Sequence, residues 1–209
     1  MLTRLFGSRA RVRLLKLFLF NPDQRFYIRQ IARNLDLQVN SVRRELENLK
    51  SFGLLAVGGK VGGKEEASAG EESEKKSGQE KYYYVNKDFV LFGELRSLIA
   101  KAQVLYKKDF MDNIKKVGSP QLVVLTGLFV DNDKAPVDLL IVGKVEKKKV
   151  KTVIGKLEKE LGTELNFTIL SSAEFKYRRD ITDVFLYNIL ETRNIILIDK
   201  IGVTAEPEE

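Results

Sequence analysis

The sequence predicts an α+β fold made of two domains. Apolar residues recur at helical spacing through most of the first 57 residues, and short aliphatic runs alternate with helical segments after residue 118. Hydrophobic residues make up 44% of the 209 positions, which is enough for packed cores. No apolar run approaches the about 18 residues that a membrane span needs, so we expect no membrane-spanning segment.

The chain is organised around residues 26–55. Two short segments each carry one apolar stripe with a 3.6-residue period, and Asp36-Leu37-Gln38 joins them. Two helices joined this tightly form a helix-turn-helix, whose second helix can enter the major groove of DNA. The two predicted stripes are Ile28, Ile31, Ala32 and Leu35 in the first helix, and Val39, Val42, Leu46 and Leu49 in the second.

The opposite face of the second predicted helix is polar and basic, which suits a DNA surface. The alternative is a small helical hairpin whose basic face is merely solvated. The predicted DNA-binding residues, with the end of the turn included, are Gln38, Asn40, Ser41, Arg43, Arg44 and Lys50.

The neighbouring segments favour a larger motif. Arg9 to Phe20 predicts a preceding helix, Gly53 ends the second helix, and Leu54 to Val57 and Lys81 to Asn86 predict a pair of strands. The stretch LLKLFLFNPDQRFYIRQIARNLDLQVNSVRRELENLKSFGLL resembles the winged-helix domains of small prokaryotic transcription regulators of the ArsR and MarR kind. The resemblance implies a winged helix-turn-helix DNA-binding domain over residues 1–87. Gln38 stands where such turns often carry Ser, Thr or Asp, so we expect a less sharply capped recognition helix.

The charge distribution supports a polyanionic partner. Residues 1–57 hold 11 Lys or Arg and 4 Asp or Glu, a formal charge of +7, while the remainder holds 25 of each kind. The segment between the predicted strands, residues 58–80, is rich in Gly, Ser, Glu and Lys and predicts a flexible, solvated wing tip. Tyr82, Tyr83 and Tyr84 should alternate between the two faces of their strand, so that one or two pack on the core.

Residues 88–117 predict linker helices, Asp88 to Lys108 and Asp109 to Val117, which Gly118-Ser119-Pro120 ends. Such helices can pair two subunits or pack on their own chain, and the apolar stripe fits both. Residues 118–201 alternate strands with helices and predict a small α/β domain with a mixed sheet. Its predicted strands lie at 122–126, 137–142, 165–170 and 195–198. Its predicted helices lie at 147–161 and 181–192, with a further helix between them that Ser172 caps and that continues through Phe175. Residues 202–209 predict a disordered tail.

The second domain resembles the minimal nucleotidyltransferase-like domains of the polymerase-beta superfamily. The matching stretch is LVVLTGLFVDNDKAPVDLLIVG, in which Gly127 and Leu128 stand for the family's Gly-Ser, and Pro136 and Asp138 for its Asp-x-Asp. The strand that should supply a third carboxylate, LNFTIL, contains no acid. Nucleotidyl transfer needs carboxylates to hold two divalent metals. The resemblance therefore implies a degenerate site without catalysis, metal or cofactor.

Nearby acids do not obviously repair that motif. Asp131 and Asp133 lie in the preceding loop, which does not fix them at Asp-x-Asp geometry, so we interpret them as solvated loop residues. We expect Asp138 to hydrogen-bond a neighbouring turn.

Composition narrows the function further. The chain has no Cys and no His, which excludes disulfides, thiolate zinc sites and Ser-His-Asp or Cys-His catalysis. We predict a cytoplasmic, DNA-binding transcription regulator that binds double-stranded DNA as a homodimer. Its second domain would serve dimerisation, partner binding or the sensing of a small-molecule or nucleotide effector. The alternatives are an active nucleotidyltransferase of the antitoxin type and a winged-helix adaptor that binds protein.

Overall fold

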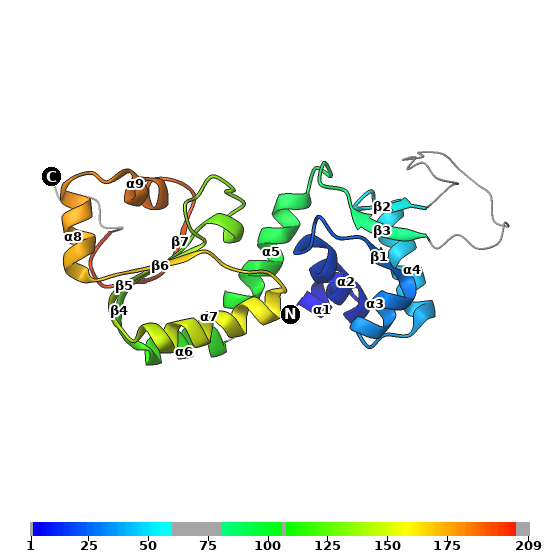
Figure 1. Ribbon diagram of the computed structural model, residues 1–209, viewed down its shortest axis with the longest axis horizontal. Helices are drawn as coiled ribbons and strands as arrows, with labels where there is room; N and C mark the ends of the chain where they lie inside the picture. Colours follow the sequence, from blue (N-terminus) through cyan, green and yellow to red (C-terminus); the bar gives the residue numbers. More distant parts are fainter. Residues whose placement is uncertain (1, 60–80, 106–107, 204–209) are drawn as a thin grey trace. The chain divides into compact units, whose positions relative to one another are not determined.

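The computed structural model describes residues 2–59, 81–105 and 108–203 of an α+β protein. The chain divides into two compact units, Met1–Phe92 and Gly93–Glu209 (Figure 1). The predicted linker helices mostly fall within the second unit. Most of the predicted wing tip (60–80) and of the predicted tail (204–209) lies outside the described residues.

The N-terminal unit combines helices with a three-stranded antiparallel sheet of order β1-β3-β2. A short helix, Leu2–Phe6, precedes the predicted helix that begins at Arg9, and Gly7, with φ of 71°, separates the two. Ser8 caps the second of these helices, because its side-chain oxygen accepts a hydrogen bond from the amide of Arg11. The two-residue strand β1 was not predicted. The helices are α1 (Leu2–Phe6), α2 (Arg9–Leu19), α3 (Ile28–Asn34) and α4 (Val39–Ser51), and the strands are β1 (Phe26–Tyr27), β2 (Leu55–Gly58) and β3 (Tyr82–Val85).

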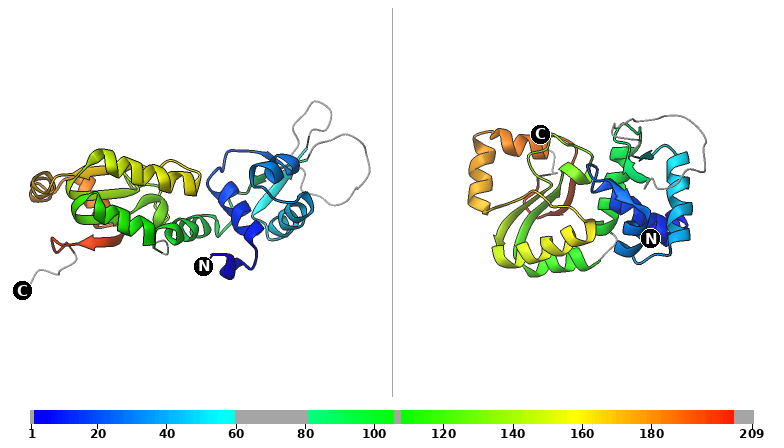
Figure 2. Two further views of the ribbon diagram at one scale, coloured as in Figure 1. Left: turned by 90° about the horizontal axis from the view of Figure 1, so that it is seen from below. Right: turned by 45° about the vertical axis from the view of Figure 1, so that its right-hand side comes forward.

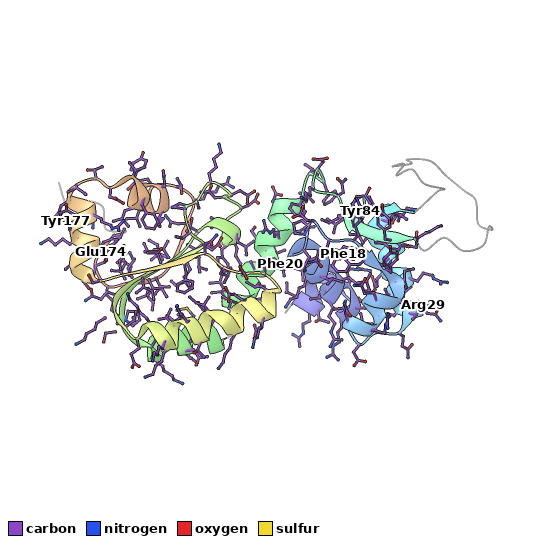
Figure 3. The ribbon with its side chains drawn as sticks, viewed as in Figure 1. Phe18, Phe20, Arg29, Tyr84, Glu174 and Tyr177 are labelled. Carbon is purple, nitrogen blue, oxygen red and sulfur yellow. The ribbon has the colours of Figure 1, made fainter. Side chains whose placement is uncertain are left out.

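The core of this unit lies between the three longer helices and the sheet (Figure 3). Phe18 of α2 is fully buried and meets Phe26 of β1 edge-on, with ring centroids 5.3 Å apart. The predicted stripe of α4 is wrong at its first position, because Val39 is 40% exposed at the end of the buried stripe. Glu45 is buried on this stripe instead, beside Leu46.

The C-terminal unit is built on a four-stranded mixed sheet, as the sequence predicts, and the strand order is β6-β5-β4-β7. Only the β5–β6 pair is parallel. The strands are β4 (Gly118–Leu125), β5 (Leu139–Val145), β6 (Phe167–Leu170) and β7 (Ile195–Asp199). The helices are α5 (Phe92–Leu105), α6 (Lys108–Lys116), α7 (Lys147–Leu161), α8 (Ser172–Asp180) and α9 (Val184–Leu190), with a short 3-10 turn η1 (Gly127–Phe129).

Helices cover both faces of this sheet (Figures 1 and 2). Leu122 and Val142 face the core formed with α8 and α9, which includes Phe175 and Leu186. Val123 and Ile141, their neighbours along the strands, point to the other face and are also fully buried. This double burial explains why both strands read as continuous aliphatic runs.

Several predicted boundaries shift. Strand β4 begins at Gly118, because Gly118-Ser119-Pro120 pairs with Lys144 and its neighbours as well as ending α6. Helix α5 begins at Phe92, since the chain first turns through backbone bonds from the amide of Phe89 to Asn86 and from that of Phe92 to Phe89. Ser171, not Ser172, caps α8, which continues to Asp180.

Candidate nucleic-acid interface and the cavity of the C-terminal unit

The first candidate site is the outer face of α4. Residues 35–38 form the turn from α3, with Asp36 at φ 46°, and Gln38 is the N-cap of α4 without a side-chain capping bond, as predicted. The described geometry exposes all the predicted DNA-binding residues except Ser41, which is half-buried. Those exposed are Gln38, Asn40, Arg43, Arg44 and Lys50.

Helical spacing brings Asn40, Arg43 and Arg44 onto one face, and Glu47 lies on it as well. Glu47 was not among the predicted residues. Its Oε1 accepts a hydrogen bond from the hydroxyl of Tyr83 at 2.9 Å, and its Oε2 lies 4.0 Å from Nζ of Lys50. The face therefore carries one acid among its cations, and this acid is attached to strand β3.

Tyr83 is the buried member of the tyrosine run, 2% exposed, so the prediction that at least one tyrosine packs on the core is confirmed. Burial raises the pKa of its phenol, and the hydrogen bond to Glu47 and the charge of that carboxylate raise it further. Tyr83 therefore stays a neutral donor to Glu47 at physiological pH.

A second link holds α4 on α2. Nε of Arg11 donates to Oε2 of Glu45 at 2.9 Å, and the Glu45 side chain is almost wholly buried. Burial raises the pKa of the Glu45 carboxyl, but hydrogen bonds from Ser8 and Arg11 outweigh burial and bring the pKa below its ordinary value. The spacing from Val42 to Leu49 places Glu45 at the edge of the apolar stripe, but nothing local in the sequence identifies Arg11 as its partner.

The outer face of the three-stranded sheet carries the other two tyrosines. The ring of Tyr82 lies across Gly58, where any Cβ would overlap it, and the guanidinium of Arg25 lies 5.0 Å from the ring centre. Tyr27 and Tyr84 contact Tyr82 at centroid distances of 6.2 and 6.1 Å. Because the ring of Tyr82 is already covered by Gly58 and Arg25, this cluster is a structural reinforcement of the sheet.

The second candidate site is a cavity of about 220 Å³ in the C-terminal unit, at the ends of strands β4, β5 and β6 where the predicted nucleotidyltransferase motif lies. Asp138 is its structural centre. Oδ1 accepts the backbone amide of Leu128 at 2.7 Å, and Oδ2 accepts that of Asn166 at 2.9 Å. The predicted role of Asp138 as a hydrogen-bond partner of a neighbouring turn is thus confirmed.

The other residues of the predicted nucleotidyltransferase motif lie around Asp138 or in the loop before it. Gly127 has φ of 51°, and a Cβ there would overlap Oδ1 of Asp138, so the tight approach requires glycine. Leu128 is buried and Pro136 is exposed. Asp133 lines the cavity, whereas the carboxylate of Asp131 packs on Gly93 of α5. Over the residues that the structure describes, no group of three or more acidic side chains is placed to hold a metal ion.

Arg96 of α5 also lines this cavity, although no local sequence pattern marks it as a site residue. Its Nε is buried and has no hydrogen-bond partner within the described part of the chain. Its terminal nitrogen lies 3.8 Å from Oδ1 of Asp133, beyond ordinary hydrogen-bonding distance. Arg96 therefore forms a long ion pair with Asp133 beside the cavity, while its Nε is enclosed by the protein.

Comparison of the chain with protein-family models, curated proteins and solved structures gave no match. In the described ranges, no helix is both long and apolar enough to cross a bilayer.

Proposed function

We propose that the protein is a DNA-binding transcription regulator, in which the N-terminal unit is a winged helix of the ArsR and MarR kind. The order α2, α3, α4, β2, β3 supports this proposal, with β1 as the third strand of the wing sheet. In this reading α4 is the recognition helix. Its N-terminal half would enter the major groove, where side chains can read base edges.

The observation that carries the proposal is the exposed trio of Asn40, Arg43 and Arg44 on one face of α4. Arginine reads guanine with two parallel hydrogen bonds, and asparagine reads adenine in the same way. The Arg11–Glu45 and Tyr83–Glu47 contacts fix the helix that presents them. The charge of +7 concentrated in residues 1–57 would supply the phosphate attraction.

For the C-terminal unit we propose a nucleotidyltransferase-like fold without catalysis, which serves dimerisation, partner binding or effector sensing. The hydrogen bonds of Asp138 support a structural role for this residue, because each of its two carboxylate oxygens accepts a backbone amide. A single winged helix reads only a short site, so we further propose a homodimer that binds two half-sites about one helical turn apart.

The testing experiment is selection of double-stranded DNA from a random library by the purified full-length chain. We expect enrichment of a two-fold symmetric sequence whose half-sites repeat at about one helical turn. Sedimentation of the enriched complex then gives the number of chains per site. Failure to enrich any sequence, together with binding that does not weaken with salt, would contradict the proposal and favour a protein-binding role for the first unit.

A further inference from the structure

The charge that follows residue 57 is balanced in sum but unevenly distributed. Residues 115–116 and 144–151 together hold seven lysines and a single acid, Glu146. That acid already has a partner, because its Oε1 accepts a hydrogen bond from Nζ of Lys149 at 2.6 Å. The other six lysines, which we call the lysine patch, are Lys115, Lys116, Lys144, Lys147, Lys148 and Lys151.

The fold brings these two segments to the same end of the four-stranded sheet (Figure 1). Helix α6 ends one residue before Val117, whose carbonyl accepts the amide of Glu146 at 2.8 Å, and α7 starts directly after Glu146. Helices α6 and α7 also pack on each other. Every member of the lysine patch is exposed, and none forms an ion pair within the part of the chain that the structure describes. The end of α6, the end of β5 and the first turns of α7 thus form one surface with six uncompensated positive charges.

The start of α7 is cationic against the local preference of a helix. The amide end of a helix carries a partial positive charge, so acids stabilise the first turn and lysines destabilise it. The first turn of α7 holds three consecutive lysines, residues 147–149, and no acid, and the side chain of Glu146 at the N-cap makes no capping bond. Natural sequences depart from such stability rules mainly at functional sites.

We propose that the lysine patch binds the phosphate backbone of double-stranded DNA, so that the C-terminal unit contributes sequence-independent affinity. Lysine is a flexible point charge that pairs with phosphate, whereas arginine and asparagine read bases through two parallel hydrogen bonds. The patch consists of lysine alone, which suits contacts to the backbone rather than to base edges. The choice of DNA among polyanions rests on the proposed function, but the patch lies in a different unit from α4.

An anionic membrane is the other large polyanionic surface that lysines could meet. Helices that lie on membranes combine lysines with apolar side chains that enter the interface. Among the described residues of α6 and α7, no large hydrophobic side chain is exposed, and the apolar stripe of α7 is buried in its own unit. The patch therefore offers charge without an apolar anchor, as contact with a phosphate backbone requires.

The test measures binding of the full-length chain to two labelled duplexes, the selected sequence and an unrelated sequence of the same length. The patch variant is Lys147→Gln, Lys148→Gln, Lys151→Gln. The control variant, Lys134→Gln, Lys176→Gln, Lys200→Gln, removes the same charge from exposed positions elsewhere in the C-terminal unit.

We expect the patch variant to bind the unrelated duplex about tenfold or more weakly than the control variant at low salt. Its slope of log affinity against log salt concentration should be shallower by about one for each lost phosphate contact. The selected duplex should show the same fold-loss, because phosphate contacts carry no sequence information. Melting curves verify folding, and the patch variant should be at least as stable as the unmodified chain, since it removes two lysines from the first turn of α7.

The unrelated duplex keeps this proposal separate from the proposed function. If α4 reads no sequence, the unrelated duplex still tests the lysine patch. If the patch has no role, the two triple variants bind both duplexes equally, while variants of α4 still lose the selected sequence. Equal affinities of the triple variants would therefore overturn the proposal, as would failure of the unmodified chain to bind the unrelated duplex at low salt. Binding to vesicles of about one-third phosphatidylserine that is as tight as binding to DNA, and that the patch variant loses, would overturn it in favour of a membrane.

Discussion

The hydroxyl of Tyr83 donates to Oε1 of Glu47 at 2.9 Å and thereby joins strand β3 to the exposed face of α4. Glu47 lies one turn from Arg43 and is 4.0 Å from Lys50. The side chains proposed to meet DNA thus share their surface with an acid that strand β3 of the three-stranded sheet holds in place.

The double variant Arg43→Ala, Arg44→Ala should lose affinity for the selected DNA. An arginine that reads a base edge should contribute about 1–3 kcal/mol of binding free energy. An arginine that contacts a phosphate should contribute about one unit to the slope of log affinity against log salt concentration, so its loss makes that slope shallower. Fluorescence anisotropy at several salt concentrations measures both quantities. The control Lys134→Ala, Arg193→Ala removes the same charge from exposed positions of the C-terminal unit. Equal affinities for the two double variants would refute the assignment of α4.

Tyr83→Phe should destabilise the protein by about 0.5–1.5 kcal/mol, since it removes one hydrogen bond while the buried ring stays. Urea unfolding followed by circular dichroism gives the difference. Tyr84→Phe is the matched control, because its half-buried ring lies on the other face of the same strand and its hydroxyl makes no hydrogen bond among the described residues. An unchanged midpoint for Tyr83→Phe would mean that the Tyr83–Glu47 bond contributes nothing measurable to folding.

Glu45 should make stability fall in acid. Its pKa is lower in the folded protein than its ordinary value of 4.5. The stabilisation is therefore present above about pH 4.5 and is lost as the pH falls through the lower folded value. Glu45→Gln should cost about 1–3 kcal/mol at pH 7 and flatten the acid limb of the stability curve. Thermal melts between pH 3 and 7 measure this, and the exposed control Glu191→Gln should reproduce the curve of the unmodified chain.

Asp138→Asn should destabilise the C-terminal unit by about 1.5–3 kcal/mol, because an amide keeps only one of the two acceptor oxygens and no charge. Asp133→Asn, at an exposed position of the same cavity, should change stability little. Denaturant unfolding distinguishes them. If Asp138 instead served to bind a metal ion, the stability of Asp138→Asn would be unchanged. The unmodified protein would then transfer label from nucleoside triphosphates in the presence of magnesium, and Asp138→Asn would abolish this transfer.

Much of the architecture could be predicted because it depends on local patterns. The helix over residues 147–161 has the bounds that its apolar periodicity indicates, and the strands at 122–125 and 139–142 follow from their aliphatic runs. Strand β1 escaped prediction because two residues, Phe26 and Tyr27, carry no period, and only their pairing with β3 defines them.

The sites were less accessible to sequence reasoning. The exposure of Arg43 and Arg44 follows from helical spacing alone, and so does the burial of Val42. The contacts that decide the chemistry join residues far apart in the chain: Glu45 with Arg11, Glu47 with Tyr83, and Asp138 with Asn166. The position of Arg96 beside the cavity likewise depends on the packing of α5 near loops that are distant in the chain, which no local pattern indicates.

The double engagement of Asp138 also bears on how this chain can evolve. A mutation that freed its carboxylate for a cation would at once loosen the η1 turn and the approach of residue 166 to the sheet. The residue at position 138 is therefore constrained by the fold itself, so that sequence variation there is limited by the two backbone amides it accepts, whatever chemistry the neighbouring cavity has.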